Sequence, residues 1–518
     1  MITKTARRFL VCIAIATVIG VMPIARPAQA ADVSSAIEAG GTVNIDGADT
    51  FVIDSVNDGE PGGTAVITFA DDATTAVDSL TISGDDTDNK DFGNLAKISG
   101  IVALDDNGSN TLILTGTNGN TIQNGNLWLR VAGDISGDVA TDANDLRIVI
   151  DATTSAVDNN SILIVEGDID LGSGQLTLTG DANNEARLIY DANGSQIVHG
   201  TTISTTDDVG SYIGIANSNT AATITFFDAL GSNGSGGIAN ISIGANAIFN
   251  STVDGNSIDI DANAASVTAD FNDNVTGSTI IVEGGNTDGK VATAKFAGDV
   301  TVTSITLDDE AGETTDDAVL RFDGSSPQSV TGTITGAQDG EGQIIVETGS
   351  DVPLNNGIGG SDYDIDNFVV QSEATATLNL IALRTQQAAG TAIDIDGTLV
   401  LNTASGNVVI SESLTEGGSI DIDGTLSVIG GGGNANISNN NGGGFSIDGT
   451  LTTQLSGVGA TLRLRDASGA LSIGTNSDIT ISAGNQIVTA SSFTLGASGT
   501  KTIINARKTA ILIRMRQR

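Results

Sequence analysis

The residues of this sequence best suited to chemistry are carboxylates, because the chain holds 63 Asp and Glu against 21 Lys and Arg. Six pairs of adjacent aspartates occur, namely Asp71-Asp72, Asp85-Asp86, Asp105-Asp106, Asp207-Asp208, Asp308-Asp309 and Asp316-Asp317. Paired carboxylates can act as acid and base in the cleavage of polysaccharides. Adjacent residues of a β-strand point to opposite faces, however, so such a pair does not by itself form a catalytic pair.

A carboxylate centre for glycan cleavage also needs Lys, Arg or His nearby, and the basic residues of this chain are isolated. The single histidine, His199, follows Ile197 and Val198 and lacks the G-H-G and R-I-K contexts of β-helical hydrolases. We therefore expect His199 to be an exposed residue at a strand end. We predict no catalytic residues and no enzymatic activity, with a polysaccharide lyase or hydrolase on a β-helix as the alternative of another class.

Calcium is the metal that excess carboxylate oxygens favour, since hard cations prefer oxygen ligands and relieve repulsion among acids. The segments Asp394-Ile395-Asp396-Gly397 and Asp421-Ile422-Asp423-Gly424 match only the end of a calcium loop. Weak calcium binding is therefore the only metal prediction, and its ligands are unknown. Outside the N-terminal leader the chain has no Cys, one His and no phosphate loop, so we expect no cofactor.

The first thirty residues have the features of a Sec signal peptide. Lys4, Arg7 and Arg8 precede an apolar stretch from Phe9 to Met22, and Ala28-Gln29-Ala30 is an A-x-A cleavage site. The stretch is too short to favour a transmembrane helix. We predict cleavage after residue 30, export through Sec and no transmembrane segment in the mature chain.

Charge separates the body of the chain from its C-terminal end. Between Ala31 and Thr500 there are eleven basic and 63 acidic residues, a net of 11 − 63 = −52. Such a body repels phosphates, so we expect no binding to nucleic acid. Residues 501–518 instead hold six basic residues and no acidic one. We expect this basic tail to be unstructured or the end of a fragment.

The body repeats itself with a period in the twenties. The template F-x3-V-x4-I-x-[ILV] begins at Phe249, Phe271 and Phe296. A second series begins at Ile395, Ile422 and Ile447. Such periods are typical of solenoids, in which each unit buries its apolar edge only by stacking on its neighbours.

Local patterning indicates that the units are strands. Thr111–Thr115, Leu176–Thr179 and Val300–Thr303 are rich in β-branched residues and largely alternate, without a helical period. The sequence therefore predicts an all-β fold, a parallel β-helix or β-solenoid of 22–27-residue coils over residues 31–500.

Glycines and prolines predict where the coils turn. Four glycines follow Asp where a chain leaving a strand would need a positive φ, namely Gly47, Gly397, Gly424 and Gly449. The glycine-rich stretches Gly231–Gly237 and Gly430–Gly444 are expected to be loops extruded from the coils. The prolines of the body fall in polar, turn-like segments at Pro61, Pro327 and Pro353.

Part of the body resembles passenger repeats of Gram-negative autotransporter surface antigens. The resemblance lies in Leu320–Gly324, Gln328–Gly336 and Gly342–Val346, together with the preceding unit F-x-G-D-V-T-V at Phe296. It extends over about residues 245–480, and other secreted β-solenoid adhesins and some surface-layer proteins share it. It implies a β-helical, surface-exposed and often adhesive protein.

The family also has a C-terminal β-barrel translocator. This chain stops at Arg518 without an aromatic residue after Phe493, so we expect the translocator to be absent from it or export to follow another route. We predict an exported structural or adhesive protein, on the cell surface, the outer membrane or outside the cell. The predicted partner is a host or neighbouring-cell surface, or a second copy. A surface-layer lattice subunit remains the alternative.

Overall fold

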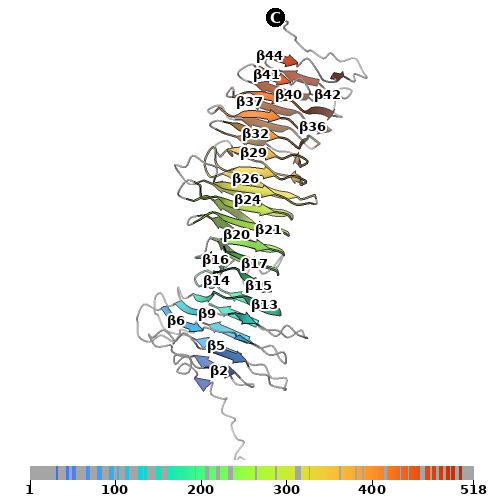
Figure 1. The fold of residues 1–518 in the computed structure, drawn as a ribbon. Helices are drawn as coiled ribbons and strands as arrows, with labels where there is room; N and C mark the ends of the chain where they lie inside the picture. The colour runs from blue at the N-terminus through green and yellow to red at the C-terminus, as the bar shows by residue number, and fades with distance from the viewer. Residues whose placement is uncertain are drawn as a thin grey trace, which may run out of the picture.

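The protein, described by a computed structural model, is an elongated stack of β-strands that follow the chain from one end of the rod to the other (Figure 1). The described part covers residues 134–466 except for 137–146, 153–159, 193, 205–208, 218–221, 232–236, 263–264, 286–288, 310–316, 326, 361–362, 380–381, 388–389, 405, 413–416, 432, 441–442 and 456–460. Outside 134–466 it covers the backbone of the strands named below.

The strands form long ladders in which neighbours pair in parallel. Sheet 1 consists of β1 (Ala31–Asp32), β3 (Thr50–Ile53), β5 (Ser79–Ser83), β7 (Val102–Ala103), β8 (Thr111–Thr115), β10 (Ile135–Ser136), β11 (Arg147–Asp151), β13 (Ile169–Thr179), β15 (Gln196–Ser204), β17 (Thr223–Phe226), β19 (Asn246–Phe249), β21 (Val267–Phe271), β23 (Ala292–Phe296), β25 (Ala318–Phe322), β27 (Gln343–Val346), β29 (Asn367–Val370), β32 (Thr391–Ile395), β35 (Ser419–Ile422), β38 (Phe445–Ile447), β41 (Ala470–Ile473) and β44 (Ser492–Leu495).

Two further sheets and one strand pair complete the coils. Sheet 2 consists of β6 (Gly93–Ile98), β9 (Asn126–Val131), β12 (Ser161–Val165), β14 (Ala186–Ala192), β16 (Ser211–Asn217), β18 (Ile238–Ile243), β20 (Val253–Asp261), β22 (Val275–Glu283), β24 (Val300–Asp308), β26 (Val330–Gly336), β28 (Asp351–Leu354), β30 (Thr375–Asn379), β33 (Thr398–Asn402), β36 (Thr425–Gly430), β39 (Thr450–Leu455), β42 (Asp478–Ile481) and β45 (Lys501–Ile503). Sheet 3 consists of β31 (Ala382–Thr385), β34 (Val408–Glu412), β37 (Ala435–Asn439), β40 (Thr461–Asp466) and β43 (Gln486–Thr489), and β2 (Thr42–Ile45) pairs with β4 (Val66–Phe69).

This arrangement confirms the predicted parallel β-solenoid. Phe249 pairs with Phe271 and Phe271 with Phe296, so each coil there has the length that the first template predicts. Ile395 pairs with Ile422 on the next turn, as the second repeat series predicts. Sheet 2 continues through β45, and it therefore includes the first three residues of the segment expected to be a basic tail. The predicted signal peptide, residues 1–30, and residues 504–518 lie outside the described part.

Alternation along each strand builds the core. In β15 every second residue is buried, as expected for a strand with one face against the interior. We call the inner column the buried position that ends the strands of sheet 1 from β17 to β38 and continues back to Val198 within β15 and Ile169 at the start of β13, and no side chain in it is more than 3% exposed. It runs through Ile169, Val198, Phe226, Phe249, Phe271, Phe296, Phe322, Val346, Val370, Ile395, Ile422 and Ile447.

The middle of the inner column is a stack of phenylalanine rings. From Phe226 to Phe296 successive ring centroids lie 4.8–5.0 Å apart with planes within 10° of parallel. Phe322 continues the stack at 6.2 Å and 30°, and Tyr190 of sheet 2 closes its other end edge-on at 5.1 Å. These separations suit offset-stacked and edge-to-face pairs, worth about 0.5–1.5 kcal/mol each beyond area burial.

The predicted reason for the Asp-Gly glycines is wrong. Gly397, Gly424 and Gly449 do not have a positive φ. They are required because successive turns pass too close for a side chain: a Cβ on Gly424 would lie 2.0 Å from the carbonyl oxygen of Gly397, and one on Gly449 1.9 Å from that of Gly424. Gly47 lies outside the described part.

The predicted loop at Gly430–Gly444 is also wrong, because it contains β37, a strand of sheet 3. Asn439 at the end of this strand is fully buried and donates to the carbonyl oxygens of Gly418 and Gly444. Short Gly-rich links therefore connect faces of one coil rather than leave it. The loop predicted at Gly231–Gly237 lies mostly outside the described part.

One proline departs from its predicted place. Pro327 forms only an isolated bridge, whereas Pro353 lies inside β28. On one side β28 pairs fully with β30, and on the other it pairs with β26 only at Val330 and Leu354. Proline has no N–H to donate, which accounts for its tolerance where the ladder is incomplete. Pro61 lies outside the described part.

Candidate interaction surface

The residue that follows each inner-column residue lies on a second line along the rod, which we call the edge column. Its members are Asp170, His199, Phe227, Asn250, Asn272, Ala297, Asp323, Glu347, Gln371, Asp396, Asp423 and Asp448. From Phe227 onward each backbone N–H donates to the inner-column carbonyl of the preceding turn, as in Asn250 to Phe226 at 2.8 Å. These backbone N–H groups are therefore bonded within the fold, and only the side chains of the edge column are available to a partner.

After Asp170, the first segment of the edge column runs from His199 to Asn272 and consists of aromatic and amide side chains. The rings of His199 and Phe227 stack with centroids 4.4 Å apart and planes at 18°, and the Phe227 side chain is 43% exposed. Asp228 accepts the N–H of Gly200 at 2.8 Å and lies 3.8 Å from Nδ1 of His199. On the next turns, Nδ2 of Asn272 donates to Oδ1 of Asn250 at 2.9 Å.

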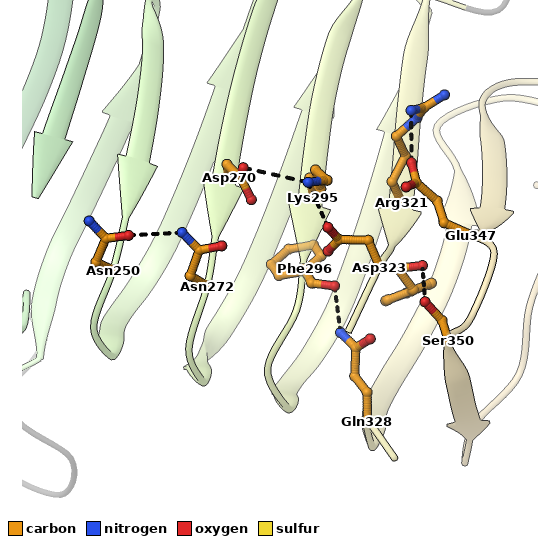
Figure 2. A network of polar contacts seen from close by, with 11 residues as sticks. Asn250, Asp270, Asn272, Lys295, Phe296, Arg321, Asp323, Gln328, Glu347 and Ser350 are labelled. Atoms are coloured by element: carbon orange, nitrogen blue, oxygen red, sulfur yellow. Dashed lines mark hydrogen bonds and ion pairs between the residues drawn. The ribbon is translucent and has the colours of Figure 1, made fainter. Parts of the chain in front are cut away.

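In the second segment the edge-column residues Asp323 and Glu347 pair with Lys295 and Arg321, which precede the inner-column residues of neighbouring turns (Figure 2). Nζ of Lys295 lies 2.6 Å from Oδ2 of Asp323 and 3.6 Å from Oδ2 of Asp270, one turn on either side. Nη1 of Arg321 lies 2.8 Å from Oε1 of Glu347 on the following turn. These pairs link successive coils, and the side chains of Lys295, Asp270 and Asp323 are mostly buried, at 27%, 23% and 20% exposed.

The environment of Lys295 shifts two pKa values. Burial raises the pKa of Asp270, which the charge of Lys295 opposes and that of Asp323 reinforces. Burial alone would lower the pKa of Lys295, yet its bond to Asp323 and the nearby carboxylates outweigh burial and raise it. The cation is therefore held in its charged form between two carboxylates.

The third segment is acidic. Asp394 and Asp421 pair in register on the outward face, and Oδ1 of Asp421 accepts the Ser446 hydroxyl at 2.5 Å. Burial raises the pKa of Asp394, and the charges of Asp396 and Asp421 raise it further. Partial loss of hydration and the charges of Asp421 and Asp448 raise the pKa of Asp423 in the same way.

The sequence explains why this segment is acidic without compensation. From residue 385 to residue 462 there is no Lys, Arg or His, while seven Asp and Glu occur. From His199 onward, the edge column and the outward residues that precede the inner column therefore change along the rod from aromatic and amide, through paired charges, to uncompensated acid. Six of the twelve members of the edge column could have been found from the sequence by listing the residue after each Phe or Ile that begins a repeat, namely Asn250, Asn272, Ala297, Asp396, Asp423 and Asp448.

In each of two turns, a buried glutamine side chain bridges two backbone carbonyl oxygens of the preceding coil, an arrangement that we call a clamp. It was not predicted from the sequence. Nε2 of Gln328 donates to the carbonyl oxygen of Phe296 at 2.9 Å (Figure 2) and to that of Gly298 at 2.7 Å. Nε2 of Gln196 donates in the same way to those of Val165 and Gly167, at 3.1 and 2.6 Å. Both glutamines are at most 2% exposed.

The clamped turns share a sequence signal. Each glycine of the clamp precedes an aspartate, Asp168 or Asp299, which accepts the N–H of the residue after the glutamine at 2.8 or 2.7 Å. A Gly-Asp pair followed by glutamine slightly more than one coil later therefore marks this turn, as Gly167 and Gln196 do.

The aspartate pairs take different places. Asp308 lies half-buried on β24, whereas Asp309 is buried and accepts the N–H groups of Ala318 at 2.6 Å and Gly342 at 2.8 Å. Asp317 is buried and accepts the N–H of Gly289 at 3.1 Å. The carboxylates of Asp309 and Asp317 thus stabilise the backbone of neighbouring segments through these hydrogen bonds. The side chains of Asp71-Asp72, Asp85-Asp86, Asp105-Asp106, Asp207-Asp208 and Asp316 lie outside the described part.

The predicted place of His199 at a strand end is wrong: it is the fourth of nine residues in β15, because the strand continues through Gly200 to Ser204, and its side chain is 40% exposed. Among the described residues, no group of three or more His, Cys, Asp or Glu side chains is placed to hold a metal ion. No helix in the described part of the chain has the length and apolar character to cross a membrane. Comparisons with models of protein families, with curated protein sequences and with solved structures found no match.

Proposed function

We propose that this chain is exported through Sec and acts as a structural or adhesive rod on a Gram-negative cell surface, without catalytic activity. The observation that carries the proposal is the edge column, which aligns one side chain from each of twelve successive turns. The packed inner column beneath it keeps that line rigid, so a partner can contact several turns at once without a large ordering cost.

Three features of the sequence support export and surface display. The first thirty residues have the charge, length and cleavage pattern of a Sec signal. The repeats around Phe296 and Leu320 resemble autotransporter passengers. The strong negative charge of the body keeps such a rod soluble and separates it from phosphate-rich partners.

Export is tested by expressing the full chain in a Gram-negative host and treating intact cells with an external protease. We expect a mature N-terminus at Ala31, and digestion of the chain while a periplasmic marker protein stays intact. A chain that retains residues 1–30, or that is cut only after cell lysis, would contradict surface display.

Adhesion is tested with beads coated with the chain from residue 31 onward. We expect the beads to attach to host or neighbouring bacterial cells more than beads coated with an unrelated protein of matched negative charge. Ordered two-dimensional arrays by electron microscopy would favour the lattice alternative. New reducing or unsaturated ends after incubation with polysaccharides would favour an enzyme.

A further inference from the structure

The aromatic and amide segment of the edge column has the chemistry of a ligand site. The Phe227 side chain is 43% exposed, although a large apolar side chain is normally covered, and Ile197 on the preceding turn is 45% exposed. The imidazole of His199 stacks on one side of the Phe227 ring and holds it in place. An apolar platform is thereby fixed on a rigid sheet.

Polar groups of defined direction surround this platform. The bond between Asp228 and the N–H of Gly200 holds a carboxylate beside the imidazole. On the two turns after Phe227, Asn272 donates to Asn250, which leaves Nδ2 of Asn250 and Oδ1 of Asn272 facing solvent. The surface thus offers one donor group and two kinds of acceptor next to an apolar ring.

We propose that the side chains of Ile197, His199, Phe227, Asn250 and Asn272 together bind an uncharged, linear oligosaccharide lying along the rod. The C–H face of a sugar ring is apolar and slightly positive and fits the negative face of an aromatic ring. The hydroxyls of a sugar can donate hydrogen bonds to the carboxylate of Asp228 and to the amide oxygen of Asn272, and can accept one from the amide nitrogen of Asn250. Successive turns are about 4.8 Å apart, so an extended chain would meet a new side chain at each turn.

Charge and backbone bonding exclude other occupants. An acidic glycan or a second copy would approach against a body with a net charge of 11 − 63 = −52. A peptide could not add as a strand here, because the N–H groups of Phe227 and Asn250 already donate to Val198 and Phe226. The proposal deepens the adhesive role and rests on it, since it names the class of partner.

The test measures binding of the chain from residue 31 onward to neutral hexasaccharides of glucose, xylose and N-acetylglucosamine, and to hexagalacturonate as the acidic comparison. We expect at least one neutral hexasaccharide to bind, with Phe227→Ala weakening it by about tenfold. Asn272→Ala should weaken it less. Tyr363→Ala, which removes a 52%-exposed aromatic ring away from the site, is the matched control and should leave binding unchanged.

Melting curves and sedimentation velocity accompany each variant, and Phe227→Ala should remain folded and melt only slightly below the parent chain, because it loses the stack on His199 but no buried packing. The proposal is overturned if no neutral hexasaccharide binds, if hexagalacturonate binds better, or if Phe227→Ala and Tyr363→Ala act alike. Self-association that Phe227→Ala abolishes would assign the platform to a second copy and overturn it too. Coated beads that attach to cells without binding any hexasaccharide would overturn this site alone, whereas hexasaccharide binding without surface display would overturn the proposed function alone.

Discussion

Phe249 and Phe271 lie in the same register one coil apart, and their rings stack with centroids 4.8 Å apart and planes 8° from parallel. Both are 1% exposed. Identical side chains stack in this way because the parallel ladder repeats the position of each residue at the strand spacing. Each ring therefore fills space that only its neighbours on adjacent turns can close.

Removal of one ring should destabilise the rod. Phe271→Ala leaves a cavity between Phe249 and Phe296, and we expect a loss of about 3–5 kcal/mol in the free energy of unfolding. Denaturant unfolding measures the total, and hydrogen exchange of β19 and β23 measures the local effect. The matched control, Phe227→Ala on the outer side, should cost less, about 0.5–1.5 kcal/mol, because it loses the stack on His199 without leaving a cavity. Equal losses for the two variants would contradict the inward assignment.

Gly424→Ala should destabilise although the backbone angle there is ordinary. The new Cβ would lie 2.0 Å from the carbonyl oxygen of Gly397, so two turns must separate, at a cost of about 1–3 kcal/mol or more. Gly357→Ala is the control, because a Cβ there meets no atom within 4 Å. Thermal melting compares the melting temperatures of the two variants. A Gly424→Ala chain as stable as the Gly357→Ala chain would show that the turns at Gly397 and Gly424 are not in contact.

The side-chain Nε2 group of Gln328 should contribute to the free energy of unfolding through the two hydrogen bonds that it donates. Gln328→Ala removes two hydrogen bonds from buried carbonyl oxygens and should cost about 1–3 kcal/mol. Gln328→Glu should cost more at neutral pH, because a carboxylate would face the oxygens of Phe296 and Gly298, and less in acid, where the protonated group donates. The half-buried Gln371 gives the control Gln371→Glu. Urea unfolding at neutral and acidic pH measures the loss for each variant. Equal losses for Gln328→Glu and Gln371→Glu at both pH values would contradict this prediction.

Lys295→Met should leave Asp270 and Asp323 close together without the cation. We expect a loss of about 1–2 kcal/mol at neutral pH, less than for a fully buried pair because these groups keep some solvent contact. Burial already raises the pKa of Asp270, so the loss should shrink as acid protonates it. Arg463→Met, at an exposed position of β40, serves as the control, and pH-dependent melts compare the two.

Asp394→Asn should stabilise the chain at neutral pH. The folded-state pKa of Asp394 is raised above its unfolded value, so the folded chain binds a proton more tightly than the unfolded chain. Stability therefore falls as pH rises through that folded pKa, and the substitution removes this loss. The gain should stay below about 1 kcal/mol, because the carboxylate is partly solvated.

The gain from Asp394→Asn should vanish as pH falls toward the ordinary Asp range, near pKa ~3.9, and shrink at high salt as neighbouring charges are screened. Melting temperatures across pH and ionic strength test this, with Asp273→Asn, on the turn after β21, as the control. A gain that persists in acid would show that the substitution acts through packing instead of charge.

The sequence by itself determined the class of fold and the repeat. The spacing from Phe249 to Phe271 and Phe296 predicted the lengths of two successive coils, and the register confirmed both. Alternating β-branched residues identify strands because the side-chain period of a strand is a local property. The two aspartates of an adjacent pair also need not share a role: Asp308 ends β24 half-buried, whereas Asp309 just after the strand is buried.

Only the tertiary structure decided which residues meet across turns. Coil lengths vary along the rod, so contacts such as Gln328 to Gly298, Lys295 to Asp323 and His199 to Phe227 depend on how each turn stacks on the last. The need for glycine at Gly424 arises in the same way, from the close approach of Gly397 and not from its own φ. Local propensity describes one coil, whereas the surface that a partner could meet forms only when neighbouring coils bring their side chains into register.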